Sequence, residues 1–353
     1  MLSLRLTELP RAASGYLFRS LRHAVTTFEK RTARALKLAR IDVAAALRYS
    51  RGGEASHCPG CGSWRLTLLA PMPLNHRPRG RRFGFMTGCR RCGLVFANPP
   101  PSAEALSTFY SPAGAWGRAR DEDTRGKAAA PDYLLKMFSA VRSWVDVTDA
   151  PSGGRVLDVG CGSGGLLDFF ASYGWATSGI DPADKRAFPR HQELADVPAD
   201  ASYDIAVLHH VLEHVAQPLD MLRSLHRALK PGGVLFISVP RLDALPQHRD
   251  MRYCLNGRTH IVAFTWDAMR GLLARARFEA VTLNDPPELS FDRGGLRRLR
   301  VMARRVDVPV PAPGNPLAAA RTALTRYHTQ VPEPALLGWL PVRVRASLAD
   351  RRR

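Results

Sequence analysis

Residues 155–181 read RVLDVGCGSGGLLDFFASYGWATSGID, and this stretch decides the fold. The apolar run from Val156 to Val159 enters a turn with glycines at positions 160, 162, 164 and 165. Apolar residues at helical spacing follow at positions 166, 167, 169 and 170, and a second apolar stretch ends on Asp181. The pattern predicts a strand, a glycine turn, a helix and a second strand, which together form the βαβ unit of a nucleotide-binding fold.

Two carboxylates beside the glycine turn indicate which ligand it binds. Asp181 follows the first glycine by about twenty residues, where its two oxygens can accept both ribose hydroxyls of an adenosine. Asp158 precedes that glycine by two positions, where a carboxylate repels a pyrophosphate but suits the ammonium and sulfonium groups of S-adenosylmethionine. The glycines alone also satisfy a dinucleotide fingerprint, so these acids carry the preference for S-adenosylmethionine over NAD.

Two blocks further along the chain carry a family resemblance. Residues 203–215 read YDIAVLHHVLEHV, and residues 229–240 read LKPGGVLFISVP. Together with the DxGxGxG turn and Asp181, this ordered set resembles the class I S-adenosylmethionine-dependent methyltransferases over roughly residues 130–308. The resemblance implies a doubly wound, Rossmann-like α/β domain with a seven-stranded sheet, whose last strand, near Leu299–Val306, is antiparallel. The expected cofactor contacts are Asp158, Gly160, Cys161, Gly162, Gly164, Asp181, Glu193 and His209.

The segment between Asp181 and Tyr203 departs from the family pattern. It is too short for the usual full helix, third strand and turn, so we expect the adenine side to be built differently. Gln192, Glu193 and Asp196 are the candidates to hold the adenine amino group, and their spacing does not separate them. Carboxylates of a solvated loop are the alternative interpretation.

Polar residues follow the predicted fourth strand at its carboxyl end, where open α/β sheets bind ligands. A histidine near neutral pKa can take a proton from a hydroxyl, and a neighbouring glutamate can orient the ring. We name His210 as the base, with Glu213, His214 and His260 as further catalytic candidates. The alternative is that Glu213 and His214 cap the following helix. The block is also similar to the Glu-x-x-Glu-His block of ubiquinone-pathway O-methyltransferases, which holds a divalent cation there, but His210 replaces the first glutamate.

Four cysteines form two CxxCG knuckles before this domain, at Cys58 and Cys61 and at Cys89 and Cys92. Two tight turns that aim four thiolates at one point suit tetrahedral Zn²⁺, and a four-cysteine site leaves no open position, so the zinc is expected to be structural. Two disulfides are the alternative, which a cytosolic setting disfavours. The knuckles and the following Asn-Pro-x-Pro segment resemble bacterial methyltransferases with an N-terminal zinc ribbon. Cys161 and Cys254 lack partner spacing and are interpreted as non-catalytic.

The chain divides by composition into five parts. We expect a basic amphipathic helical segment over 1–50, a zinc ribbon over 51–110, a linker or lid over 111–130, the methyltransferase domain over 131–308, and a basic, proline-rich and helical tail over 309–353. The net charge of +20 sits in the flanks, since residues 151–292 carry 14 basic and 17 acidic groups. Of the 51 cationic residues 45 are arginine, so either a GC-rich genome or an anionic partner accounts for the excess.

Contacts of the two flanks stay open. The N-terminal helix either docks on the rest of the protein or lies on anionic lipid, and a mitochondrial presequence is the least favoured alternative. The tail cluster around Trp339 can contact a membrane, a partner subunit or the core. No apolar run approaches the roughly 18 residues of a membrane span, and the N-terminus lacks a signal-peptide core, so a cytoplasmic protein with possible peripheral membrane contact is expected. The sequence leaves the oligomeric state open.

The expected reaction is methyl transfer to an oxygen of a small molecule, a sugar or a lipid-linked precursor. An RNA methyltransferase is the first alternative because zinc ribbons and basic flanks also occur there. It is not favoured, because an Asn-Pro-Pro-Tyr-type motif is missing after the fourth strand, where His209 and His210 stand. The second alternative is a non-enzymatic binding module that no longer holds the cofactor.

Overall fold

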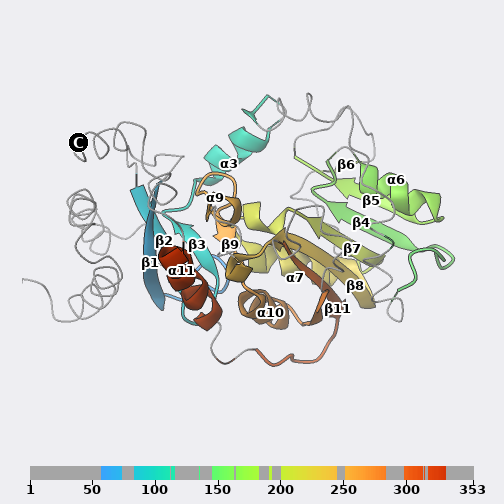
Figure 1. The fold of residues 1–353 in the computed structure, drawn as a ribbon. Coiled ribbons are helices and arrows are strands. Elements are labelled where there is room, and N and C mark those ends of the chain that lie inside the picture. The colour runs from blue at the N-terminus through green and yellow to red at the C-terminus, as the bar shows by residue number, and fades with distance from the viewer. Residues whose placement is uncertain are drawn as a thin grey trace, which may run out of the picture.

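The computed structural model describes residues 57–73, 83–111, 113–115, 135, 145–162, 164–182, 191–192, 200–244, 251–283, 298–312, 314 and 317–330. Two sheets organise this part of the chain (Figure 1). The helix expected within residues 1–50 and the tail cluster around Trp339 lie outside the described residues, as does nearly all of the expected linker over 111–130.

The larger sheet has seven strands in the order β10-β11-β8-β7-β4-β5-β6. Its strands are β4 (Arg155–Val159), β5 (Ala176–Ile180), β6 (His191–Gln192), β7 (Tyr203–His209), β8 (Leu229–Pro240), β10 (Phe278–Leu283) and β11 (Arg298–Arg305). The strands from β6 to β8 pair in parallel, whereas β11 runs antiparallel to both β8 and β10. The predicted seven-stranded, doubly wound sheet with an antiparallel last strand is therefore confirmed. The chain order reverses between β4 and β7, which defines the switch point where such sheets bind ligands.

Side chains point alternately to the two faces along each strand, and in the central strands both sets are buried. Helices therefore cover both faces of this sheet. α6 (Gly165–Ser172) packs Phe169 and Phe170 on one face, against Val207 and Phe236. On the other face lie α7 (Pro218–Ala228) and α10 (Trp266–Arg275), whose leucines pack among residues such as Leu208. Thr265 caps α10 as its position in the sequence predicts, accepting the Ala268 N–H through Oγ1 at 3.2 Å.

The segment after Asp181 corrects one expectation. Its shortness led us to predict that it lacks room for the usual helix, third strand and turn, yet β6 is present and pairs with Gly179 and Ile180 of β5. Two residues suffice to continue the sheet, so the length of the segment did not exclude a third strand.

The smaller sheet has the order β1-β2-β3-β9 and contains the cysteine knuckles at one end. Its strands are β1 (Leu66–Pro73), β2 (Phe83–Cys89), β3 (Val95–Asn98) and β9 (Val262–Ala263). We call residues 57–110 the cysteine module; besides three of these strands it includes α3 (Ala103–Tyr110), capped by the Ser102 hydroxyl. β9 comes from the chain that follows His260, so this sheet joins the module to the larger domain.

The module packs on both sides. Cys58, Cys92 and Leu94 belong to the core that also contains Leu272 of α10. From the tail, α11 (Ala318–Gln330) lies across the small sheet (Figure 1), and its buried face includes Ala320 and Leu324. The remaining short helices are η4 (Leu212–His214), η5 (Leu242–Ala244) and α9 (Met251–Cys254).

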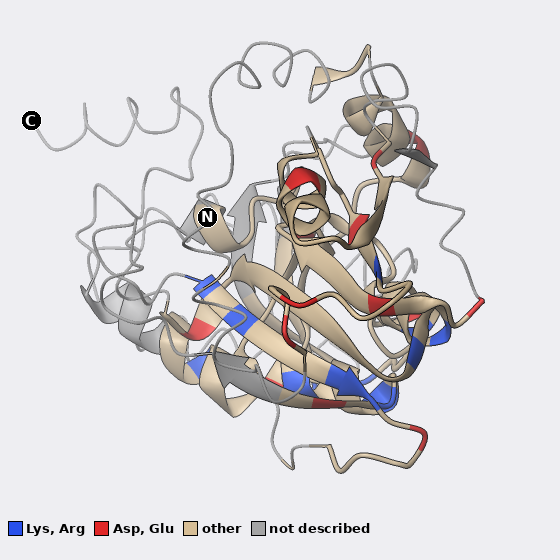
Figure 2. Cartoon of the chain, turned by 90° about the vertical axis from the view of Figure 1, so that its right-hand side faces the viewer, with Lys and Arg blue, Asp and Glu red and all other residues tan. Residues whose placement is uncertain are grey.

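Two further observations concern membrane-spanning helices and the distribution of charge in the described part of the chain. None of the helices in the described ranges combines the length and apolarity needed to cross a bilayer. Figure 2 shows that acidic as well as basic residues are distributed over the described elements.

Candidate functional site

The glycine turn after β4 has the geometry that only glycine tolerates. Gly160 has a φ of 77°, and an added Cβ would overlap the Val211 side chain. Gly164, with a φ of 82°, occupies the N-cap of α6. The backbone N–H of Gly162 donates to Oδ2 of Asp181 at 2.9 Å. Asp181 therefore holds the turn from the end of β5, in addition to the ribose contact that its position predicts.

A second carboxylate lies beneath the same turn. Asp158 is the fourth residue of β4 and is only 3% exposed. Burial, and next the charge of Asp181, raise the pKa of Asp158 to about 7. Two buried carboxylates at the ends of neighbouring strands repel each other, and a cation between or beside them relieves this cost. The site therefore suits a positively charged donor such as S-adenosylmethionine and disfavours a pyrophosphate.

Other expected cofactor residues divide into described and undescribed ones. Cys161 is buried in the turn, and its N–H donates to the Ile180 carbonyl at 3.2 Å. His209 ends β7, where burial, followed by the charges of His210, Arg298 and Arg300, lowers its pKa to about 3. It is consequently neutral at pH 7. Glu193 and Asp196, two of the adenine candidates, lie outside the described residues, whereas Gln192 is in β6.

His210 and Glu213 form a hydrogen-bonded pair at the carboxyl end of β7. The His210 Nδ1 lies 3.0 Å from Oε1 of Glu213, whose side chain is fully buried. The pKa of Glu213 is raised, and burial is the largest cause of this shift. His210 has a φ of 57°, an uncommon backbone conformation that persists only where the surroundings enforce it. Its N–H donates to the Ser238 carbonyl at 2.8 Å, which fixes it there.

His214 and His260 complete the group of predicted catalytic residues. The His214 Nδ1 lies 2.8 Å from the Thr259 carbonyl oxygen, and the His260 Nδ1 lies 2.6 Å from that of Tyr253. Because a carbonyl only accepts, both Nδ1 atoms carry the proton and both Nε2 atoms carry a lone pair. Burial lowers the pKa of both rings, which pack edge to face with centroids 4.8 Å apart.

The loop before β9 holds this group in place through a feature that sequence reasoning missed. Oδ1 of Asn256 accepts the N–H groups of Arg258, Thr259 and His260, at 2.9, 2.9 and 3.1 Å. An asparagine that accepts from following N–H groups is a known turn former, so Asn256-Gly257 was the available signal. The alternative, that Glu213 and His214 cap the following helix and pin the loop, is half correct. No cap is seen in the described residues, because both lie in η4 and α7 begins later, at Pro218. Both do hold the loop before β9, through the Thr259 carbonyl and the Ile261 N–H.

Three buried polar atoms around these residues have no hydrogen-bond partner in the described part of the chain. They are Nε2 of His209, Oε2 of Glu213 and Oγ of Ser238. An unsatisfied buried polar group costs about 1–3 kcal/mol. His209 and Ser238 are also register partners on β7 and β8. Such a set is typical of a site completed by a ligand. Ser238 was missed because it lies within an apolar strand.

Tyr110 is a third residue, after Asn256 and Ser238, that the sequence did not reveal. It ends α3 in the cysteine module, and its hydroxyl oxygen lies 2.7 Å from Nδ1 of His214. We call His209, His210, Glu213, His214 and His260 the histidine block. Tyr110 precedes His214 by 104 positions, so no sequence spacing indicates that the two residues meet.

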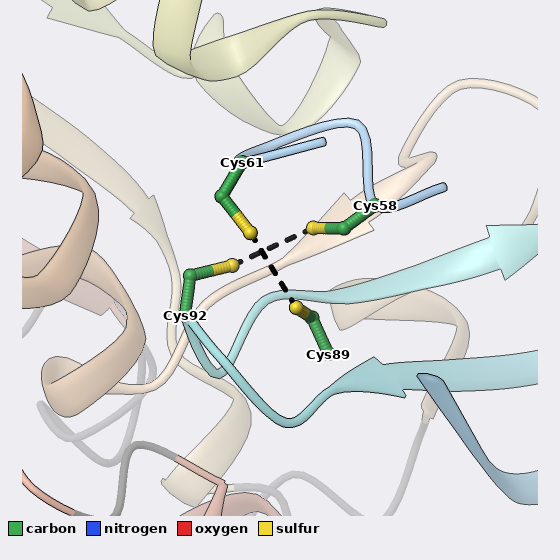
Figure 3. Close-up of side chains that lie close together, drawn as sticks. All are labelled: Cys58, Cys61, Cys89 and Cys92. Carbon is green, nitrogen blue, oxygen red and sulfur yellow. Dashed lines mark hydrogen bonds between the residues drawn. The ribbon is translucent and has the colours of Figure 1, made fainter. Parts of the chain in front are cut away.

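The four knuckle cysteines converge as predicted (Figure 3). Sγ of Cys58 lies 3.5 Å from that of Cys92, and Sγ of Cys61 lies 3.6 Å from that of Cys89. A tetrahedral ion with Zn–S bonds of about 2.3 Å sets its ligand sulfurs about 3.8 Å apart, so the donor set fits zinc. All four cysteines are free, which disagrees with the disulfide alternative. The hydrogen bond with Cys58, the largest cause, lowers the pKa of Cys89 to about 7.

A second, smaller set of ligand atoms lies in the histidine block. Glu213, His214 and His260 each offer one ligand atom, and these atoms lie within 4.8 Å of one another. His210, at the position of the first glutamate in the similar ubiquinone-pathway block, is not in this set.

Strand order and glycine turn define the class of this domain, and comparison with known families agrees. Residues 133–283 match the family model described as "Methyltransferase domain". The chain therefore contains a class I methyltransferase domain, of the kind that uses S-adenosylmethionine.

Individual relatives match shorter stretches. The ubiquinone biosynthesis O-methyltransferase of Pseudomonas aeruginosa (strain LESB58) is 31% identical over 114 residues, covering 27% of this chain and 48% of that protein. The enzyme of the same name from Paracidovorax citrulli (strain AAC00-1) is 30% identical over 164 residues, covering 42% and 64%. The chain thus spans about half the length of the first of these curated relatives. Among solved structures, a Burkholderia thailandensis 1,6-didemethyltoxoflavin-N1-methyltransferase has a TM-score of 0.43 at 21% identity, covering 61% of this chain and 95% of that one.

Proposed function

We propose that this protein transfers a methyl group from S-adenosylmethionine to a hydroxyl oxygen of a small molecule. One observation carries the proposal. The glycine turn, with the buried carboxylates Asp158 and Asp181 beside it, follows β4, and the His210–Glu213 pair follows the adjacent strand β7, on either side of the switch point of a class I methyltransferase sheet. A site for a cationic donor therefore adjoins a site for proton removal.

When bound, S-adenosylmethionine supplies an electrophilic methyl group on a positively charged sulfur. Asp158 and Asp181 contribute the negative charge that favours this cation, and the N–H groups of the glycine turn position its polar end. Cys161 and His209 line the approach to the turn as further proposed contacts, with Glu193 kept as an adenine candidate.

His210 is the proposed base. If its Nδ1–H donates to Glu213, its Nε2 holds the lone pair that takes the acceptor's proton. Glu213 then stabilises the imidazolium that forms, as a buried carboxylate does in other carboxylate–histidine pairs. His214 and His260, whose Nδ1 protons are fixed by carbonyl groups, are proposed to shape the polar wall around Glu213 rather than to take the first proton.

The acceptor class follows from the need for base assistance and from the relatives. A hydroxyl must lose its proton during methyl transfer, and two relatives are named O-methyltransferases of ubiquinone biosynthesis. We therefore propose a hydroxylated small molecule, with phenolic, sugar and lipid-linked hydroxyls as the classes to test. Radiolabelled S-adenosylmethionine offered with catechols, nucleotide sugars and polyprenyl-linked precursors is the direct experiment. Label in a hydroxyl-derived ether supports the proposal, and label found solely on nitrogen, carbon or added RNA overturns it.

We further propose that the cysteine module holds a structural Zn²⁺. The four sulfurs leave no ligand position open, so the ion would stabilise the module and take no part in methyl transfer. Six cysteines that form no disulfide favour a reducing compartment, and we propose the cytoplasm.

A further inference from the structure

The cysteine module reaches the histidine block through the end of α3. Tyr110, the last residue of this helix, places its hydroxyl oxygen 2.7 Å from Nδ1 of His214, and the two rings meet edge to face with centroids 5.8 Å apart. Tyr110 lies outside residues 133–283, the part that matches the methyltransferase family model.

The direction of the hydrogen bond follows from the second partner of His214. Nδ1 also lies 2.8 Å from the carbonyl oxygen of Thr259, which can only accept. The proton is therefore on Nδ1, and the Tyr110 oxygen is its second acceptor. Burial, and then the charge of Glu213, raise the pKa of Tyr110, so it remains a neutral phenol whose own proton is directed away from His214.

The contacts of Nδ1 with Tyr110 and Thr259 orient the His214 ring toward Glu213 of the proposed catalytic pair. With Nδ1 held between Tyr110 and Thr259, the opposite nitrogen, Nε2, lies 3.9 Å from Oε1 of Glu213. The same Oε1 is 3.0 Å from His210. The tautomer of His214 thus decides whether a lone pair or an N–H faces the carboxylate that holds the proposed base.

The cysteine module contacts the histidine block and its loop at two further points. The guanidinium of Arg258 lies 5.0 Å from the Phe109 ring centroid, next to Tyr110 on α3. On the other side, the N–H of Ala97 donates to the Ile261 carbonyl at 2.9 Å, and the N–H of Ile261 donates to the Glu213 carbonyl at 2.9 Å. The module and the histidine block are therefore joined by consecutive hydrogen bonds, and Tyr110 is the side chain that enters the block.

We propose that Tyr110 is a positioning residue of the methyl-transfer site, supplied by the cysteine module, which holds the His214 ring whose Nδ1–H tautomer the Thr259 carbonyl fixes. The module is then a working part of the acceptor side and not a separate binding domain. This inference rests on the proposed function for its purpose, but the ring geometry that carries it does not.

The test compares Tyr110→Phe with wild type by ¹⁵N NMR of histidine-labelled protein, with His214 assigned through His214→Gln. Tyr173→Phe, at the C-terminal end of α6, is the matched control. Loss of one ordinary hydrogen bond to the His214 Nδ1–H should speed the exchange of this proton with solvent about five-fold. An unchanged exchange rate, a slower one, or an equal change in Tyr173→Phe overturns the proposal.

A calorimetric titration with S-adenosylhomocysteine keeps the two proposals separate. Wild type that fails to bind contradicts the proposed function, whereas the exchange of the His214 Nδ1 proton in Tyr110→Phe is measured without any cofactor. Tyr110→Phe is expected to bind S-adenosylhomocysteine within about two-fold of wild type, because Tyr110 contacts the histidine block and not the glycine turn. A loss of ten-fold or more in that affinity contradicts a role confined to the acceptor side.

Discussion

Nδ1 of His210 lies 3.0 Å from Oε1 of Glu213, and the glutamate side chain is fully buried. An ionised carboxylate in such a place is stabilised when a neighbouring group donates a proton to it. The pair therefore binds a proton more favourably than either residue alone, which is the property that a base in a methyl-transfer site requires.

Replacing His210 with alanine should reduce turnover by about 10²–10⁴-fold, the usual contribution of a positioned general base. Affinity for S-adenosylhomocysteine should stay unchanged, because the glycine turn does not depend on this side chain. Steady-state methyl transfer and calorimetry measure the two effects. Turnover equal to wild type would remove His210 from the proposed mechanism.

Asp158→Asn tests the buried carboxylate beneath the glycine turn. The folded-state pKa of Asp158 is about 7, above its value of about 4 in an unfolded chain. A carboxyl with a raised pKa contributes stability below the unfolded value and loses it as the pH rises through the folded value. Wild type should therefore lose about 2–3 kcal/mol relative to Asp158→Asn between pH 5 and pH 8. Urea unfolding at both pH values measures this, and parallel stability curves would contradict the raised pKa.

The cysteine cluster predicts a metal content that one substitution removes. Wild type should carry about one zinc per chain, and Cys92→Ser should lose it and unfold at lower temperature. Cys254→Ser is the control, because Cys254 is also buried and not in a disulfide but lies outside the cluster. Elemental analysis and thermal melts provide the measurements. Equal zinc in the two variants would show that the four sulfurs are not the ligands.

Packing of the module on α10 predicts a steric effect at Gly60. An added Cβ there would lie 2.8 Å from Leu94 Cδ2 and 3.0 Å from Leu272 Cδ2. Gly60→Ala should therefore destabilise the protein by about 1–3 kcal/mol, the usual cost of overpacking a core. Gly314→Ala is the matched control, with nothing within 4 Å of its added Cβ. Equal unfolding free energies for the two variants would contradict the packed interface.

Local patterns were enough to predict the larger sheet and its turns. The apolar run after Asp204 was expected to form a strand and does so in β7, and Thr265 stands at the N-cap of α10, where a threonine is favoured. The glycine turn was likewise predictable, because the positive φ angles at Gly160, Gly162 and Gly164 favour residues without a Cβ. These features depend on neighbours in the sequence, so their signals are short.

Features that depend on distant pairing could not be predicted. β9 has two residues and becomes a strand only because β3, more than 160 positions earlier, pairs with it. Tyr110 reaches His214 through that same docking, and Ser238 faces the site because of the register of β7 with β8. The sequence predicted that His210, Glu213, His214 and His260 lie in one site. The carbonyl groups that hold the rings of His214 and His260 could not be predicted, because they come from loops without a periodic pattern.

Calorimetric titration with S-adenosylhomocysteine tests the central proposal most directly. We predict binding at about one molecule per chain with micromolar or tighter affinity, a loss of at least ten-fold in Gly160→Ala through the clash with Val211, and no competition by NADH. Failure of wild type to bind, or displacement of S-adenosylhomocysteine by NADH, would contradict the proposal that the turn between Asp158 and Asp181 holds a sulfonium methyl donor.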